Sequence, residues 1–390
     1  MNIGIFTDTY PPQVNGVATS CDMLRKTFEA HGHTVYVVTT NTFSNKMEYN
    51  DKVLLIPGLL LKKLYNYRLA GIFHPKAFNI IKSWNLDIIH SQTESGVGLF
   101  GRIIAHILNK PLIYTYHTMY VDYTYYVTKG ILDQSVKYLV KKVSKVLCES
   151  CTEFTTPSEK TKNALREYGV DRFINVVPNG IDLEKFERNE ENEKRIKEYR
   201  KENNLEDTFI LLSLGRIAEE KSIDVLLKGY AAFLAKKPVK KTKMLVVGDG
   251  PSKANLEKLV ADLDITQNVD FIGKVPYSDV PFYYQLADLY LSASTSETQG
   301  LTFIESIASK TLVLCRFDEN LVEVIKDNVT GFYFGDEYSF STKLEKIINL
   351  EKNEKENIIN TAYKNNRRYS LEAFYENMEE VYNRARRKKW

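Results

Sequence analysis

The chain has 390 residues, of which 43% are hydrophobic and 26% charged, with a net charge of +3. This composition argues against a disordered or fibrous chain and is typical of a soluble globular enzyme, and the length favours two domains. No apolar run reaches the roughly 18 residues of a membrane span. The first residues enter an apolar strand with no basic segment before them, so we expect no signal peptide.

Four cysteines are too few for a disulfide scaffold in a chain of this length. Cys148 and Cys151 form a single C-x-x-C pair with no second pair at zinc spacing. This favours a structural role over a redox or metal-binding one. Together with the expected lack of a signal peptide, cysteine usage predicts a cytoplasmic protein.

The first half of the chain alternates apolar runs with amphipathic segments, which predicts a parallel, doubly wound sheet. Strands are expected at 1–6, 35–39, 87–90 and 111–116, and helices near 18–30 and 96–108. A proline-rich loop after the first strand ends at Gly16, where backbone N–H groups could approach an anionic ligand. An ordinary turn is an equally good interpretation of that loop.

His117 directly follows the strand expected at 111–116. A lone histidine is most often a structural side chain, but ligands bind at the carboxyl ends of parallel strands. The segment 131–146 has apolar residues at helical spacing and lysines on its other side, which predicts a helix with a solvated basic face.

The second half repeats the alternation after a highly charged boundary segment at 184–207. Strands are expected at 209–214, 244–248, 269–273, 289–291 and 311–315, and helices at 225–235, 303–308 and 371–387. Gly248-Asp249-Gly250 superficially suggests a dinucleotide fingerprint, but G-x-G-x-x-G is absent. Its absence counts against a dinucleotide oxidoreductase, the alternative from another enzyme class.

Arg216 and Lys221 lie five residues apart just beyond the strand expected at 209–214. Both could reach one diphosphate, since arginine supplies a planar fork of donors and lysine a point charge. The alternative is a surface ion pair with Glu219 or Glu220.

Glu297 and Glu305 flank a strand–loop–helix junction in the motif Glu-x7-Glu, with Gly300 between them. Glu297 is expected on the loop, where it can point at a ligand. Glu305 is expected about two turns into the helix. A helix start at the carboxyl end of a strand suits an anion or a nucleotide sugar. Two solvated carboxylates are the alternative for an isolated motif of this kind.

These segments, in this order, resemble the retaining glycosyltransferases of family 4, which have the GT-B fold. That fold consists of two doubly wound, Rossmann-like domains that face a central cleft. The resemblance implies an N-terminal acceptor-binding domain at 1–178 plus 371–390 and a C-terminal donor domain at 179–370. One departure lies at Lys310-Thr311-Leu312, where the family usually has Gly-Thr-Pro, so the local turn geometry is in question.

The resemblance also implies the roles of individual residues. Glu297 and His117 would contact the donor sugar during catalysis, and Glu305 would hold the nucleotide ribose. Arg216 and Lys221 would hold the donor diphosphate. The remaining donor-site residues implied in this way are Gly16, Gly300 and Leu301.

The segment 121–126 is most similar to the lipid glucosyltransferases of the family, which implies that Asp122 and Tyr123 lie on the acceptor side. The implied donor is a nucleotide sugar, with UDP-glucose favoured. The implied acceptor is a lipid, either diacylglycerol or glucosyl diacylglycerol. A transferase of the same fold that acts on phosphatidylinositol, polyisoprenyl phosphate or a protein is the alternative. No Asp-x-Asp lies in a metal-binding setting, so no metal ligand from the protein is expected, although Mg²⁺ could assist. No nucleic-acid partner is expected.

The interval from Lys52 to Leu86 carries six lysines and arginines and no acid. Its cations are interleaved with leucine and tyrosine, a pattern typical of an element that lies on an anionic membrane surface. Lys62, Lys63 and Arg68 are therefore expected to contact the membrane, with a basic loop over the acceptor site as the alternative. We expect peripheral attachment to the inner face of the cell membrane.

Overall fold

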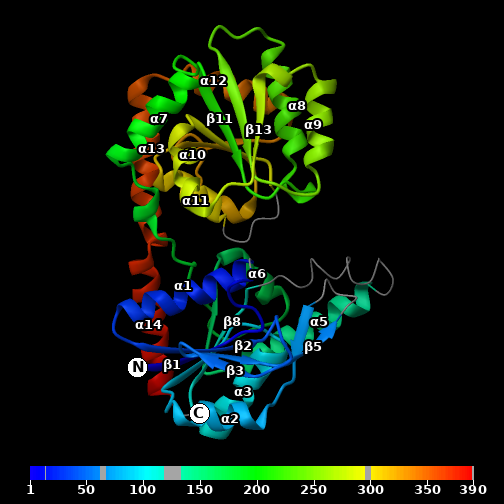
Figure 1. Cartoon of the computed structure of the whole chain (residues 1–390), viewed down its shortest axis with the longest axis vertical. Helices are drawn as coiled ribbons and strands as arrows, with labels where there is room; N and C mark the ends of the chain where they lie inside the picture. The colour runs from blue at the N-terminus through cyan, green and yellow to red at the C-terminus, as the bar shows by residue number, and fades with distance from the viewer. Residues whose placement is uncertain (14, 62–66, 118–132, 295–299, 389–390) are drawn as a thin grey trace. The chain divides into compact units, whose positions relative to one another are not determined.

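The structure is a computed structural model that describes residues 1–13, 15–61, 67–117, 133–294 and 300–388 (Figure 1). The chain forms two compact units. Unit 1 contains Met1–Gly180 and Leu371–Trp390, and unit 2 contains Ile181–Ser370. The first crossing between the units lies two residues after the one expected from the sequence, and the second crossing lies at the expected position.

Unit 1 is built on an eight-stranded sheet in the order β10-β9-β8-β7-β1-β2-β4-β3. All neighbours pair in parallel except β3 and β4. The strands are β1 (Asn2–Phe6), β2 (Thr34–Thr40), β3 (Glu48–Asn50), β4 (Val53–Ile56), β7 (Ile88–Ser91), β8 (Leu112–Thr115), β9 (Glu153–Thr156) and β10 (Asn175–Val176). The strand order reverses between β1 and β7, which makes their carboxyl ends the switch point where ligands bind in such sheets.

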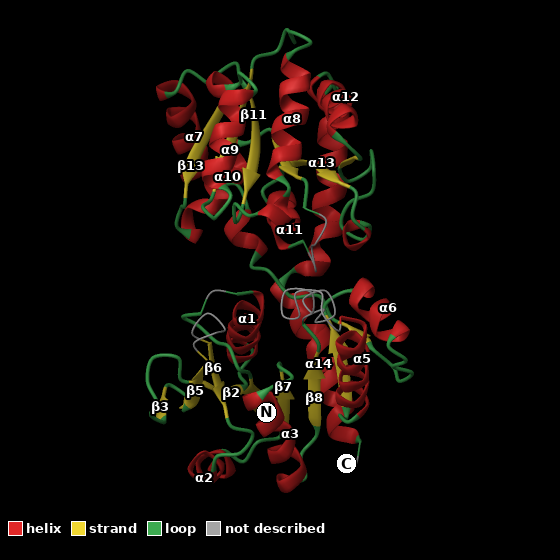
Figure 2. Ribbon diagram, turned by 90° about the vertical axis from the view of Figure 1, so that its right-hand side faces the viewer, coloured by secondary structure: helices red, strands yellow, loops and turns green. Residues whose placement is uncertain are grey.

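Helices cover both faces of the unit 1 sheet (Figure 2). They are α1 (Gly16–Ala30), α2 (Pro75–Ser83), α3 (Gly96–Leu108), α5 (Asp133–Glu149), α6 (Glu159–Glu167) and α14 (Leu371–Arg387). One hydrophobic cluster joins α1 and α14 to the sheet, and another joins α2 and α3 to it. Of the helices that the structure describes, none combines the length and the hydropathy needed to cross a bilayer.

The C-terminal helix α14 belongs to unit 1 because its apolar residues repeat at helical spacing and pack on the sheet. Phe374, Met378, Val381, Tyr382 and Ala385 are all buried there. An ion pair just past the end of the helix adds to this packing, since the Lys388 ammonium lies 2.6 Å from the buried Glu153 carboxylate.

Unit 2 has a six-stranded parallel sheet in the order β13-β12-β11-β14-β15-β16. Its strands are β11 (Phe209–Leu214), β12 (Thr242–Val247), β13 (Val269–Gly273), β14 (Leu289–Ser292), β15 (Leu312–Arg316) and β16 (Phe332–Phe334). Its helices are α7 (Glu190–Glu202), α8 (Ile223–Leu234), α9 (Lys253–Asp262), α10 (Val280–Leu286), α11 (Leu301–Ala308), α12 (Glu337–Ile348) and α13 (Lys352–Asn366). The order reverses between β11 and β14, so the loops after these two strands flank the switch point.

Alternation along the central strand explains why helices cover both faces of the unit 2 sheet. In β11, Leu211 packs into the cluster that includes α8, α9 and α12, whereas Ile210 and Leu212 pack into the cluster that includes α10 and α11. All three side chains are fully buried. Successive side chains of a strand point to opposite faces, so a strand apolar at every position belongs between two helical layers.

A small hairpin was missed by the sequence analysis. β5 (Gly58–Leu61) and β6 (Tyr67–Ala70) pair antiparallel inside the interval that was interpreted as a membrane-surface element, with a basic loop over the acceptor site as the alternative. The Arg68 guanidinium donates to the Gly58 carbonyl at 3.1 Å, so this cation also holds the hairpin together.

Candidate functional site

Three glycines end the strands on one side of the unit 2 switch point. Gly215, Gly248 and Gly273 follow or end β11, β12 and β13 with φ of +143°, +140° and +86°. A Cβ on Gly248 would lie 1.8 Å from the Gly215 carbonyl oxygen, so the two turns approach too closely for any side chain there. The glycines of the Gly248-Asp249-Gly250 turn are therefore explained by close packing against the loop that carries Arg216.

Arg216 lies on the loop after β11, and Lys221 ends the short 3₁₀ turn η2 (Glu219–Lys221) that follows. The Arg216 guanidinium contacts the Glu220 carboxylate at 2.7 Å, and its side chain is 67% exposed. An ion pair this exposed contributes only about 0–1 kcal/mol, so a phosphate could take over the guanidinium at little cost. Arg216 thus forms the surface ion pair that was the alternative interpretation. Its role in holding the donor diphosphate remains a prediction.

Helix α11 begins at Leu301, immediately after Gly300. Gly300 has φ of +70°, and a Cβ there would lie 2.7 Å from Leu321 Cδ2 and 2.9 Å from Phe303 Cδ2. Both the backbone conformation and the neighbouring core therefore require glycine at the helix start.

Glu305 is the fifth residue of α11, so it lies about one turn into the helix and not two turns as expected. Its carboxylate accepts hydrogen bonds from the Tyr277 hydroxyl at 2.9 Å and the Tyr284 hydroxyl at 3.1 Å. The residue is only 8% exposed, and burial raises the pKa of the carboxyl to about 7. Glu305 is thus a buried polar group fixed at both oxygens, which is unlike a solvated surface carboxylate.

The departure from the family pattern at Lys310 keeps the geometry that glycine would give. Lys310 adopts φ of +58° just after α11, and the hydrogen bonds Lys310 N–Ile307 O and Thr311 N–Ser306 O close the helix in a Schellman motif. The turn is therefore retained with a lysine in the left-handed position.

The unit 1 switch point is organised by Asp8, which the sequence analysis did not single out. This buried carboxylate accepts from the Thr93 hydroxyl at 2.6 Å, the Ser95 hydroxyl at 3.0 Å and the Val97 amide at 2.9 Å. It ties the loop after β1 to the start of α3. An aspartate in the loop just beyond the first strand was the available signal, but its partners lie more than 80 residues away in the sequence.

Gly16 is the first residue of α1, next to the cap residue Asn15, whose side chain accepts from the Ala18 amide. A Cβ on Gly16 would meet nothing within 4 Å. The protein's own packing does not require glycine here, so a requirement for it would have to come from a ligand.

His117 follows β8, and its Nε2 lies 2.5 Å from Gln92 Oε1 at the end of β7. Burial lowers the pKa of His117 to about 4, so the ring is neutral near pH 7. An amide oxygen only accepts, so Nε2 carries the proton and Nδ1 is the ring's acceptor. Gln92 is a second residue that the sequence analysis missed, and it fixes the His117 tautomer.

His90 is distinct from the candidate site. Its Nδ1 lies 2.7 Å from the Tyr382 hydroxyl and its Nε2 2.7 Å from the Thr115 hydroxyl. Burial lowers the pKa of His90 to about 3, so this neutral side chain anchors α14 to the sheet.

The Cys148–Cys151 pair is structural. Cys148 is buried, and burial raises the pKa of Cys151 to about 11, so neither thiol is activated. The Arg172 guanidinium donates to the carbonyls of Cys148, Cys151 and Thr152 and closes the end of α5.

Several candidate residues fall outside the described residues, and their structural predictions stay open. They are Lys62, Lys63, Asp122, Tyr123 and Glu297.

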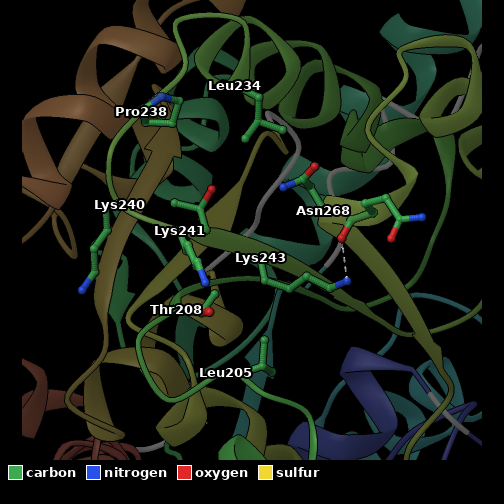
Figure 3. Close-up of a pocket in the computed structure, with 10 residues that line it drawn as sticks. Leu205, Thr208, Leu234, Pro238, Lys240, Lys241, Lys243 and Asn268 are labelled. Carbon is green, nitrogen blue, oxygen red and sulfur yellow. Dashed lines mark hydrogen bonds between the residues drawn. The ribbon is translucent and has the colours of Figure 1, made fainter.

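A separate pocket lies at the opposite, amino-terminal edge of the unit 2 sheet (Figure 3). Lys241, Lys243 and Asn268 line it near the starts of β12 and β13. Lys243 is held there by the Gln267 carbonyl at 3.0 Å and the Asp270 carboxylate at 2.8 Å. Because ligands of doubly wound sheets bind at the carboxyl ends of strands, this pocket is not the candidate site.

Two family models match the chain. The model for glycosyl transferases group 1 matches residues 195–365, and the model for Glycosyltransferase Family 4 matches residues 14–185. The two matches fall largely on unit 2 and unit 1, respectively.

Named relatives extend the similarity to nearly the whole chain. The alpha-monoglucosyldiacylglycerol synthase of Streptococcus pneumoniae is 41% identical over 89% of this chain and 78% of its own length. The alpha-monoglucosyldiacylglycerol synthase of Acholeplasma laidlawii is 30% identical over 98% of this chain and 96% of its own length. Among solved structures, Anabaena HepE in complex with UDP-glucose aligns with a TM-score of 0.72 at 16% identity, covering 98% of this chain and 99% of that one.

Proposed function

The chain belongs to glycosyltransferase family 4 and has the GT-B fold, and on that premise we propose that it transfers glucose from UDP-glucose to diacylglycerol with retention of configuration. The assignment as a hexosyltransferase, like the fold class, confirms what the sequence motifs predicted. The observation that carries the choice of acceptor is the 41% identity to an enzyme named for its monoglucosylated product. That name favours diacylglycerol over glucosyl diacylglycerol as the acceptor.

The leaving diphosphate gains negative charge as the glycosidic bond breaks, so fixed cations lower the barrier. We assign this role to Arg216 and Lys221. The geometry that supports it is their place after β11 at the switch point, together with the exposure of the Arg216 guanidinium, which leaves it accessible to phosphate. The diphosphate would replace Glu220 as the partner of Arg216.

The sugar passes through an oxocarbenium-like state, and its hydroxyls must be held in place during that passage. We assign this positioning to Glu297 and His117. The neutral ring of His117, with Nε2 bound to Gln92, presents Nδ1 as an acceptor for a sugar hydroxyl. Glu297 would accept hydrogen bonds from other hydroxyls of the same sugar.

Retention requires the acceptor hydroxyl to approach from the face of the leaving group. The departing phosphate would take its proton, so no side chain is assigned as a general base. Transfer is further proposed to need no metal ligand from the protein, with Mg²⁺ at most assisting. Among the described residues there is no group of three or more His, Cys, Asp or Glu side chains placed to hold a metal ion. Activity that persists in excess EDTA would support this proposal, and complete loss restored by Mg²⁺ would contradict it.

Attachment to an anionic membrane is the second part of the proposal, and two elements of unit 1 support it. The first element is the β5–β6 hairpin, which contains Arg68. Leu59 in β5 is 74% exposed, and Ile72 just after β6 is 54% exposed. Exposed apolar side chains that form a patch rimmed by polar residues mark interaction sites with membranes or proteins. Lys62 and Lys63 are adjacent in sequence to the end of β5.

Helix α5 supplies the other element. Leu139, Val143 and Val146 are exposed at i, i+4 and i+7, which is one stripe along the helix. Lysines at 141, 142 and 145 accompany this stripe. The sequence analysis expected only a solvated basic face here, and the exposed apolar stripe is what the structure adds. Figure 1 places α5 and β5 on the right-hand side of unit 1.

Vesicle co-sedimentation tests the attachment. Each cation near an anionic surface contributes about 1 kcal/mol, so binding should occur at low salt and weaken as salt rises. Replacing Lys62, Lys63 and Arg68 together by Ser should reduce binding and leave UDP affinity intact. Because Arg68 also holds the hairpin, the double variant Lys62→Ser, Lys63→Ser is the cleaner form of the experiment. Failure of the wild-type protein to bind anionic vesicles at low salt would remove this part of the proposal.

A panel of acceptors tests the lipid assignment. Phosphatidylinositol, polyisoprenyl phosphate and a protein acceptor represent the alternatives within the same fold. Labelled UDP-glucose supplied with each acceptor in turn should give product chiefly with diacylglycerol. A preference for another member of the panel would replace the acceptor and leave the family assignment unchanged.

A further inference from the structure

Two phenols hold a single buried carboxylate at the start of α11. The Tyr277 hydroxyl donates to Glu305 Oε1 at 2.9 Å, and the Tyr284 hydroxyl donates to Glu305 Oε2 at 3.1 Å. A buried carboxylate needs such donors because leaving it unpaired is costly. Glu305 is also the residue proposed to hold the nucleotide ribose, so any role for its two partners in nucleotide binding rests on the proposed function.

Tyr284 is the fixed member of the pair. It lies on α10, and its side chain is fully buried. Its carbonyl accepts from the Thr311 hydroxyl at 2.6 Å, and its ring packs edge-on against Tyr290 at 5.4 Å. Its hydroxyl therefore has no room to leave Glu305 without disturbing the core.

Tyr277 is held far more loosely. It starts the three-residue 3₁₀ turn η4 (Tyr277–Asp279) and is 61% exposed. The ring contact that positions it is an edge-on approach to Phe186 with centroids 6.3 Å apart. The exposed side chain thus reaches in from the surface to Glu305 Oε1.

We propose that Tyr284 positions Glu305 for the ribose, and that Tyr277 occupies Oε1 in exchange with a ribose hydroxyl. When a nucleotide binds, the ribose hydroxyl donates to Oε1 and the Tyr277 phenol turns out to water. The carboxylate keeps two donors in both states, because one phenol stays and the other is replaced.

The two tyrosines should therefore act in opposite directions on nucleotide affinity. Tyr284→Phe removes a donor that is needed in both states and lets the carboxylate shift, so UDP should bind about 10-fold more weakly. Tyr277→Phe removes a hydrogen bond that exists only without the ribose, so UDP should bind about 3- to 10-fold more tightly. A merely structural role for both residues would weaken binding in both variants.

Isothermal titration of the full chain with UDP and with inorganic pyrophosphate is the experiment. Pyrophosphate lacks the ribose, so its affinity should be unchanged in both variants. Tyr283→Phe is the matched control, because Tyr283 lies on the same helix as Tyr284 and interacts with Arg195 and Asp279 instead. Glu305→Gln should weaken UDP binding and leave pyrophosphate binding intact.

The outcomes distinguish the roles inferred for the two tyrosines from the proposed role of Glu305 in holding the ribose. Unchanged UDP affinity in Glu305→Gln would overturn the ribose assignment itself. If Glu305→Gln weakens UDP binding but Tyr277→Phe weakens it as well, the exchange is wrong. If neither tyrosine variant differs from Tyr283→Phe, the whole inference is overturned. Should Tyr284→Phe fail to fold, the sign of the Tyr277→Phe effect still decides the exchange.

Discussion

Replacing Gly300 by alanine tests whether the start of α11 is built as described. The added Cβ would enter a left-handed backbone position at φ of +70° and lie 2.7 Å from Leu321 Cδ2. The backbone conformation costs an alanine about 1–2 kcal/mol, and overpacking typically adds about 1–3 kcal/mol. A smaller gain of about 0.4–1 kcal/mol from the stiffer unfolded chain offsets part of this. The expected net loss of unfolding free energy is about 1–4.5 kcal/mol.

Scanning calorimetry is the assay, since a unit of this size should lose roughly 2–18 °C in Tm for that change. Gly16→Ala is the matched control, because a Cβ there meets nothing within 4 Å and Gly16 is outside the left-handed region. The control should keep its Tm, and it should lose transferase activity if a ligand approaches Gly16. A Gly300→Ala protein as stable as the wild type would refute the reasoning about α11.

The same geometry supports four further predictions. Lys310→Gly should raise the unfolding free energy by up to about 1 kcal/mol in calorimetry, because glycine accepts φ of +58° without strain. A destabilised variant would mean that the contact of the lysine side chain with the Tyr363 ring contributes more than the strain costs. Arg216→Ala and Lys221→Ala should each weaken UDP binding by more than the roughly 1 kcal/mol of an exposed ion pair, and unchanged titration isotherms in both would favour the surface-pair interpretation. Glu297→Gln should lower kcat about 10- to 150-fold with an unchanged Tm, and near-wild-type turnover would remove Glu297 from the site. Since the folded-state pKa of Glu305 is raised to about 7, its burial should destabilise unit 2 progressively as pH rises from about 4.5 to 7, and Glu305→Gln should abolish this part of the pH dependence of Tm.

The elements with strong apolar patterns were predictable from the sequence. The strand expected at 209–214 coincides with β11, and the helix expected at 371–387 coincides with α14. A short, fully apolar run is typical of a strand buried on both faces, and this pattern can be recognised from the local sequence alone. The β5–β6 hairpin was missed because its leucines and cations fit a surface segment equally well.

The partners of the site residues could not be predicted, because they lie far away in the sequence. Tyr277 and Tyr284 precede Glu305 by 28 and 21 residues, and only the fold brings their hydroxyls to its carboxylate. Gln92 precedes His117 by 25 residues in the same way. By contrast, the pairing of Arg216 with Glu220 could be predicted from the sequence as an alternative to phosphate binding, because the two residues lie four positions apart. Motifs thus indicated the candidate site residues, whereas the charge states and orientation of these side chains depend on tertiary contacts.

Transfer from radiolabelled UDP-glucose to diacylglycerol in anionic vesicles tests the proposed activity most directly. We expect a single lipid product that carries one glucose, whose anomeric proton in NMR has the coupling of an α-linkage. Arg216→Ala should reduce the yield of this product without changing its identity. Label recovered only as free glucose, in a β-linked lipid or in a non-lipid acceptor would contradict the proposed activity.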